Sequence, residues 1–325
     1  VCLIGSPSSA FRLAHGIDLS VAPVTRPETW ALLKHATPET LKLLARIGGR
    51  RTYARLDPIL VGETAAGIEA LAHMRSVAMG FGIAVERLPD GQIQGAAYRL
   101  RDAATNVRGE LEAALPAWLE AVEVGHLTPE KAKVTLRRDG SVKIEAKGQS
   151  IEAAQGVLAD DAAILRHIDA EAREKCFRQQ TMTSILTEPT RALPAPVMVY
   201  PDRGVTLSQR PNQAIAAFAS GTGDDALARI GACLAGHGPV RLAGQTEFSS
   251  LSTLDGAPLI GPVRGSKALL IAGLGPVAAF LAPALARFIA GVASDAERTY
   301  FAAREAGRGR MAVADYAGSP VEAVA

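Results

Sequence analysis

Hydrophobic and polar positions alternate along this chain with two different periods. Between residues 38 and 81 the apolar side chains recur at helical spacing, which predicts helices over residues 40–47 and 63–79. On both sides of Asp139-Gly140, apolar and polar residues alternate one by one, which predicts a β-hairpin. The two periods together indicate an α/β chain.

Further apolar segments extend this prediction along the chain. A strand is expected over residues 1–5, and a helix over residues 111–124 with Trp118 on its apolar side, where core packing is the ordinary role. The other predicted elements are a strand over residues 151–158, a helix from residue 161 to 167, strands over 197–200 and 214–218, and a helix over 224–234 that Asp224 caps.

One uncharged run near the C-terminus, residues 268–286, is compatible with two structures. Roughly 18 apolar residues suffice to span a membrane. Two glycines and two prolines interrupt the run, however, and Pro276 would break a spanning helix. We therefore expect a buried strand over residues 268–272, a glycine-rich loop, and a helix from about residue 277 to 292.

The turn that precedes this run reads Asp255-Gly-Ala-Pro-Leu-Ile-Gly-Pro262. Turn and run together closely resemble the C-terminal flavin-contact segment of the D-amino-acid oxidase and glycine oxidase family of FAD-dependent oxidoreductases. The resemblance implies a Rossmann-like FAD-binding domain interleaved with a substrate domain built on a mixed or antiparallel sheet. The FAD-binding domain would comprise residues 1–20, 105–172 and 255–325, and the substrate domain residues 21–104 and 173–254.

After Gly5 the N-terminal segment departs from the dinucleotide-binding pattern. The fingerprint G-x-G-x-x-G needs glycines where the chain has Pro7 and Ala10, and proline has no N–H to offer a diphosphate. Residues 8–16 instead resemble a loop that, in the family, follows a strand, a helix and a strand of roughly 30 residues. Either the chain has lost its adenosine-binding unit or a segment is missing from the sequence.

The resemblance also implies a set of site residues. Val134, on the first arm of the hairpin, would hold the adenine through its backbone. Arg12 and His15 would lie against the flavin, where a cation stabilises the anionic reduced ring, although both could equally solvate a loop. The cofactor-binding candidates are Gly5, Ser6, Ser8, Ser9, Val134, Ala159, Gly256, Gly261, Gly273, Leu274, Gly275, Pro276 and Val277.

Two features depart from the family pattern. Relatives that oxidise amino acids place arginines near residues 248–251 and 275–277 to bind the substrate carboxylate, and neither stretch holds a base here. Asp160 and Asp161 stand where relatives have a glycine against the FAD diphosphate, and carboxylates there would repel a phosphate. The alternative is that the two aspartates point outward and cap the helix that follows.

Composition narrows the functional class only a little. A net charge of +2 with dispersed Lys and Arg argues against a nucleic-acid partner. Three widely spaced cysteines and the absence of a visible signal peptide favour a reducing, cytoplasmic location without a disulfide framework. The six histidines show no metal-binding spacing, so no metal is expected.

The sequence therefore predicts an FAD-dependent oxidoreductase that oxidises a C–N bond of an amine or modified amino acid by hydride transfer to the flavin N5. Such chemistry requires binding and orientation more than an acid or base. Expected partners are a small amine substrate and a second copy or partner subunit, without nucleic acid or membrane. The rival prediction is a non-catalytic scaffold subunit or binding module of the same fold that has lost FAD binding.

Overall fold

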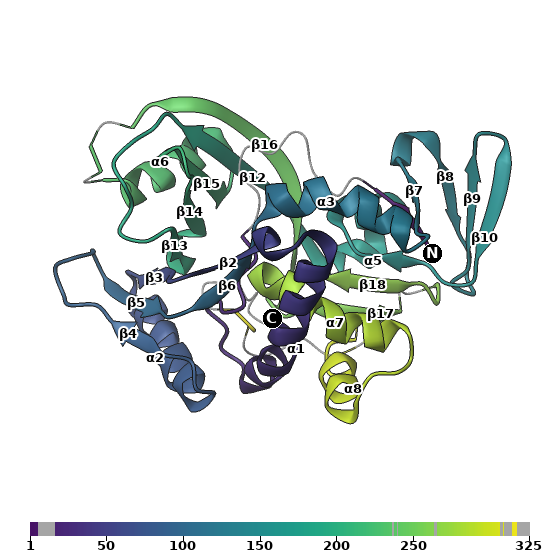
Figure 1. The fold of residues 1–325 in the computed structure, drawn as a ribbon, viewed down its shortest axis with the longest axis horizontal. Helices are drawn as coiled ribbons and strands as arrows, with labels where there is room; N and C mark the ends of the chain where they lie inside the picture. Colours follow the sequence, from purple (N-terminus) through teal and green to yellow (C-terminus); the bar gives the residue numbers. More distant parts are fainter. Residues whose placement is uncertain are drawn as a thin grey trace.

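The computed structural model describes residues 1–5, 17–235, 237–238, 240–262, 265–305, 308 and 314–316. Its largest element is an eight-stranded sheet with the order β16-β12-β15-β14-β13-β3-β5-β4 (Figure 1). Only β13 and β3 pair in parallel. The strands are β3 (Ile59–Gly62), β4 (Val85–Arg87), β5 (Ala96–Leu100), β12 (Phe177–Thr187), β13 (Val197–Tyr200), β14 (Val205–Gln209), β15 (Ile215–Ser220) and β16 (Leu242–Thr253).

In the central strands of this sheet both faces are buried, and successive residues point to opposite sides. In β3, Leu60 joins a core with helices α1 (Pro27–Gly48), α2 (Ala65–Gly80) and α7 (Ala278–Ile289). Its neighbours Ile59 and Val61 join a second core, which α6 (Gly223–Cys233) covers. All eight strands come from the two ranges assigned to the substrate half, although the exact division into domains stays a prediction.

The helices show where the apolar period predicts well and where it does not. In α2, Leu71 and Met74 are fully buried at the expected spacing. α1 begins well before the predicted start, because Pro27 occupies its first turn, where a proline is tolerated. Asp224 does not cap α6 as predicted: it lies in the first turn, and the Glu247 side chain accepts the Gly223 N–H at 2.7 Å.

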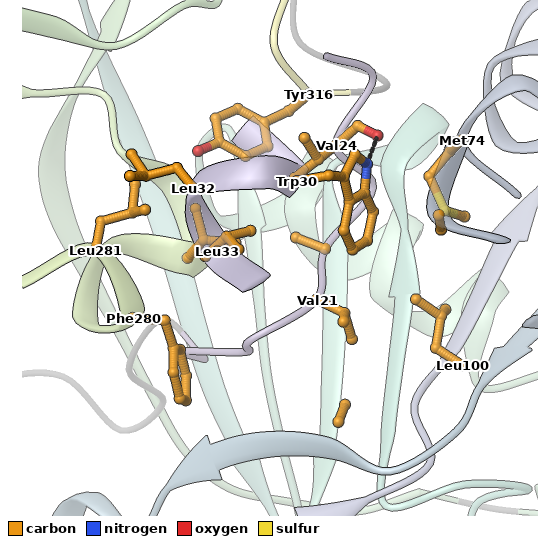
Figure 2. Packing of buried hydrophobic residues seen from close by; sticks show 14 of the residues in the cluster. Val21, Val24, Trp30, Leu32, Leu33, Met74, Leu100, Phe280, Leu281 and Tyr316 are labelled. Atoms are coloured by element: carbon orange, nitrogen blue, oxygen red, sulfur yellow. Dashed lines mark hydrogen bonds between the residues drawn. The ribbon is translucent and has the colours of Figure 1, made fainter. Parts of the chain in front are cut away.

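The main core lies between α1, α2, α7 and the large sheet (Figure 2). Trp30 and Phe280 are among its largest side chains, and both are buried. The indole N–H of Trp30 donates to the Val24 carbonyl oxygen at 3.0 Å, so the one polar atom of this side chain is satisfied.

The other strands form four small sheets (Figure 1). The predicted single strand over residues 151–158 is wrong: the segment divides between two of these sheets, and the Gly156 N–H between them donates to the Gly140 carbonyl. The small sheets are β1 (Cys2–Ile4) with β7 (Gly125–Leu127); β2 (Tyr53–Leu56) with β6 (Ala103–Asn106); β8 (Lys133–Leu136), β9 (Val142–Ala146) and β10 (Gln149–Ala153); and β11 (Val157–Leu158), β18 (Leu269–Ala272) and β17 (Leu259–Pro262).

Helix α3 (Arg108–Ala121) contains no fully buried residue, so the expected core role of Trp118 is wrong and its side chain is only half-buried. Because the helix packs mainly on α1 and the turn after it, its other sides face solvent. The remaining helices are α4 (Asp161–His167), α5 (Ala170–Glu174) and α8 (Asp295–Ala302), with short 3-10 turns η1 (Arg50–Thr52), η2 (Pro129–Lys131), η3 (Pro201–Arg203) and η4 (Gly275–Val277).

The uncharged run over residues 268–286 folds as predicted, into strand β18, a loop and the first part of α7. Helix α7 has only 12 residues. Within the described part of the chain, no helix combines the length and apolar character needed to cross a membrane.

Candidate cofactor site

The loop over residues 273–277 connects β18 to α7, as the sequence predicts. Gly273 and Gly275 have φ angles of 69° and 58°, a region that glycine occupies without strain. Both are tightly approached by other parts of the chain: a Cβ on Gly273 would lie 2.8 Å from the Thr253 methyl, and one on Gly275 would lie 3.0 Å from the Tyr316 ring. Val277 is fully buried and anchors the start of the helix.

A carboxyl group from elsewhere in the chain lies at the start of α7. Asp18 accepts the amide of Asn106 at 2.8 Å, and a backbone hydrogen bond from Ala279 acts to lower its pKa. Desolvation in this position raises the pKa of the Asp18 carboxyl above its usual value, and the hydrogen bonds only partly offset it. A helix N-terminus favours negative charge, and here an internal carboxylate takes that place.

Other polar groups of the loop also have partners within the chain. The Pro276 carbonyl accepts the Leu19 N–H at 2.7 Å, and the Leu274 carbonyl accepts the hydroxyl of Tyr316. Neither Asp18 nor Tyr316 was expected from the sequence. The only local signal for Asp18 is a charged residue in the segment 17–22, which is otherwise apolar except for Ser20. Tyr316 gives no signal, because it reaches the Leu274 carbonyl from 42 residues away.

Gly5 marks the second part of the predicted site. Strand β1 pairs directly and in parallel with β7, with Cys2 opposite Gly125 and Ile4 opposite Leu127. The Gly5 N–H donates to the Leu127 carbonyl at 3.1 Å, and the Gly5 carbonyl contacts the His126 Nε2 at 2.6 Å. The backbone of Gly5 is thus engaged by β7 and the residues around it.

The carboxylate of Asp160 lies beside Gly5, with its Oδ2 atom 3.9 Å from where a Cβ on that glycine would stand. Its Oδ1 atom accepts the Ala163 N–H at 2.7 Å and caps α4, so the predicted cap is confirmed, while Oδ2 lies on the side of Gly5. Asp161 does something else: its Oδ2 accepts the hydroxyl of Ser250 and the N–H of Leu251, both at 3.0 Å, and ties α4 to β16.

Val134 differs from the other predicted residues in that its backbone N–H and carbonyl do not face a described neighbouring strand. The Arg137 N–H donates to the Ser141 carbonyl, and hydrogen-bonded pairs alternate along an antiparallel ladder. The pair Val134 and Ile144 is therefore a non-hydrogen-bonded one, so the N–H and carbonyl of Val134 point away from β9. Among the described strands, β8 is at the edge of its sheet, and these two groups face that edge.

The other predicted residues are placed as follows. Ala159 joins β11 to α4, Gly256 lies in the turn before β17 with its carbonyl accepting the Asp315 N–H at 3.1 Å, and a Cβ on Gly261 would meet Glu305 at 3.3 Å. Ser6, Ser8, Ser9, Arg12 and His15 lie outside the described residues. No group of three or more His, Cys, Asp or Glu within the described part of the chain is placed to hold a metal ion.

Within the described part of the chain, two carboxyl groups oppose a bound FAD. A diphosphate at Gly5 would meet the Asp160 carboxylate, and a flavin carbonyl at α7 would compete with Asp18 for the helix N–H groups. The Tyr316 ring also covers one side of Gly275, which is otherwise exposed. We therefore derive no reaction step through a flavin at this site.

No protein-family model matches the chain, and no curated protein matches it. Solved structures do share its fold. Glycine oxidase from Geobacillus kaustophilus is similar over 93% of this chain and 90% of its own, with a TM-score of 0.66 and 17% identity. Iminodiacetate oxidase from Chelativorans sp. BNC1 covers 91% and 90%, with a TM-score of 0.66 and 15% identity.

NikD, described as an unusual amino acid oxidase essential for nikkomycin biosynthesis, has a TM-score of 0.73 at 12% identity, over 96% of this chain and 92% of its own. The chain therefore has the mixed α/β fold of amine and amino-acid oxidases, as the sequence predicts. At these identities the likeness concerns the fold alone, because one fold can carry unrelated functions.

Proposed function

We propose that this protein uses the amino-acid-oxidase fold without FAD, as a scaffold subunit or binding module. The observation that carries the proposal is the Asp160 carboxylate beside Gly5, at the position where the resemblance places the FAD diphosphate. A phosphate brought against Gly5 would be repelled by this carboxylate, and solvent partly screens the repulsion because Asp160 is exposed.

The second candidate is the FAD-dependent oxidation of a C–N bond in an amine or modified amino acid. Two observations favour it: the fold shared with amine and amino-acid oxidases, and the open backbone edge at Val134, where the resemblance places the adenine. Bound flavin would supply the hydride acceptor, and the chain would contribute binding and orientation. Location in the cytoplasm and a small amine ligand remain part of this candidate.

Titration of the purified protein with FAD separates the two candidates. We expect a colourless protein, and no saturable binding when flavin fluorescence and equilibrium dialysis are measured. If residual binding is measured, Asp160→Asn should strengthen it, because the amide keeps the cap on α4 and removes the charge. Asp169→Asn is the matched control, since Asp169 caps α5 in the same way through Ala172. Stoichiometric flavin in the wild-type protein would reject the proposal and support the oxidoreductase.

A further inference from the structure

The large sheet ends in two very different edge strands. Strand β4, at one edge, has three residues, and two of them, Glu86 and Arg87, are charged. Strand β16, at the other edge, has 12 residues and forms a long curved margin of the sheet (Figure 1). Natural sheets protect their edges with short strands, prolines or charged side chains. β16 contains no proline and a single charged residue, Glu247, so it is the edge suited to pair with another chain.

The ladder with β12 determines which backbone groups of β16 point outward. The Leu254 N–H donates to the Cys176 carbonyl at 3.1 Å, and this pair continues the register of the two strands. Because hydrogen-bonded pairs alternate in an antiparallel ladder, even-numbered residues of β16 bond to β12 and odd-numbered residues direct their N–H and carbonyl groups away from it. The Leu251 N–H agrees with this, since it donates to the Asp161 carboxylate of α4. Helix α4 thus occupies the outer edge at residue 251.

The open part of this edge runs from Gly244, where the regular register with β12 begins, to Ser249. Among the described residues no strand lies on its outer side, and Gln245, Glu247 and Ser249 are exposed. Gln245 and Glu247 share one face of the strand: the Gln245 Nε2 and the Glu247 Oε1 lie 3.4 and 3.3 Å from where a Cβ on Gly223 would stand. An incoming strand would therefore meet an amide and a carboxylate on that face.

We propose that β16 is a dimerisation edge, at which two copies of this chain pair antiparallel about a two-fold axis at Thr246. In this register Gln245 of each copy lies opposite Glu247 of the other, so the outward backbone groups of both residues bond across the axis. The Gln245 amide then donates to the Glu247 carboxylate. Thr246 faces its own copy, and Phe248 covers Gly244. Cross-strand pairs of these kinds, including an aromatic residue over a glycine, stabilise sheets.

The neighbouring registers each contain a conflict. An axis at Glu247 would place two carboxylates directly opposite each other, which destabilises a sheet. An axis at Phe248 would place Gln245 opposite Leu251, whose N–H already bonds to α4. An axis at Gln245 would pair Glu247 with residue 243, which is the extra residue where the register with β12 shifts. Of these four registers only the proposed one is free of conflict, so the strand is complementary to a second copy of itself.

Charge at residue 245 tests the proposed pairing. Sedimentation equilibrium of the wild-type protein should show a monomer–dimer equilibrium. Gln245→Glu should weaken dimerisation by at least about ten-fold, because it sets two carboxylates opposite each other on both sides of the axis. Gln245→Lys is the matched control and should dimerise at least as tightly as the wild type, since the ammonium group would face Glu247. A wild-type protein that stays monomeric, or equal effects of the two substitutions, would overturn the proposal.

Thiol cross-linking tests the register itself. Thr246 is the residue that would face its own copy, so Thr246→Cys should give a disulfide-linked dimer on mild oxidation with diamide. Ser249→Cys is the control on the same strand: it would face Ala243 and should not cross-link. The wild type controls for the three native cysteines. No cross-link at residue 246, or equal cross-linking of both variants, would reject the axis at Thr246.

The dimer edge goes beyond the proposed function, because it requires no cofactor site. A scaffold subunit or binding module would use such an edge for assembly, and an oxidoreductase of the same fold could carry it equally well. Saturable FAD binding by the wild type would therefore reject the proposed function and leave the dimer intact. A monomeric protein without FAD binding would reject the dimer and leave the proposed function intact.

Discussion

The large sheet and the small sheets differ in strand length and in how far their apolar side chains are buried. The large sheet has strands of 3–12 residues with a core on each face, whereas the small sheets around the candidate cofactor site have strands of 2–5 residues. Several apolar side chains of the small sheets remain partly exposed, among them Leu3, Ile151 and Val157. Helices α7 and α8 nevertheless pack into the main core, so the difference concerns the sheets and not the whole of each part of the chain.

The starts of α2 and α7 can be compared residue by residue, because a carboxyl group from a distant segment lies at each. In the large-sheet half, the Asp202 Oδ2 accepts the N–H groups of Glu63 and Thr64 at 2.8 and 2.7 Å, ahead of α2. A Cβ on Gly67 would lie 1.9 Å from this carboxylate, so the close approach requires glycine. Asp18 does the same for α7 in the other half. A carboxylate from a distant segment is thus a recurrent cap in this chain, which favours a structural role for Asp18.

The largest expected effect comes from replacing one apolar side chain by alanine in the large sheet and one in a small sheet. Leu207→Ala should lower the free energy of unfolding by about 3 kcal/mol, because Leu207 is fully buried in the second core and its loss leaves a cavity. Val157→Ala in β11 should cost less than about 1 kcal/mol, since Val157 is 38% exposed. Urea denaturation measures both, and equal losses would show that β11 is packed as tightly as the large sheet.

The same comparison explains how much was predictable from the sequence. Leu71 and Met74 follow a clear helical period, and the hairpin around Asp139-Gly140 combines alternation with a turn dipeptide, so both were predicted correctly. Strands β4 and β5 were missed, because Val85–Arg87 has only one apolar residue and Ala96–Leu100 is buried at nearly every position. Neither strand shows an alternation that sequence can reveal.

The site was less predictable than the fold. Its strand, loop and helix were found, because Gly273 and Gly275 mark the turn locally. What fills the loop comes from distant segments: Asp18 from the N-terminal half and Tyr316 from the C-terminal end. A local pattern holds no information on such contacts, since they depend on how the chain packs.

A smaller effect is expected at the Asp160 cap. Asp160→Ala should lower the free energy of unfolding by about 1 kcal/mol, because the Ala163 N–H loses its partner at the start of α4. Asp160→Asn should cost only a few tenths of that, because asparagine caps equally well. Thermal denaturation of the two variants distinguishes a cap from a charge. If the asparagine variant loses as much as the alanine variant, the negative charge itself stabilises this end of the sheet.

The smallest effect concerns the pH dependence of stability at Asp18. Because desolvation raises the folded-state pKa of this carboxyl, the folded protein binds the proton more tightly than the unfolded chain does. Its contribution to stability is therefore fully present below the unfolded pKa near 3.8 and is lost as pH rises through the folded value. Asp18→Asn should remove this slope, because an amide does not titrate in this range.

Glu297→Gln provides the control of opposite sign. The Arg287 guanidinium and the Ser294 N–H hold the pKa of the Glu297 carboxyl below its usual value, so its contribution is present above the unfolded pKa near 4.5 and is lost as pH falls. Denaturation midpoints between neutral pH and pH values near 4 should therefore shift in opposite directions for the two variants relative to the wild type. If the two midpoints shift in the same direction, the surroundings of Asp18 stabilise its ionised form and the prediction is wrong. The start of α7 would then be a favourable place for an anionic ligand.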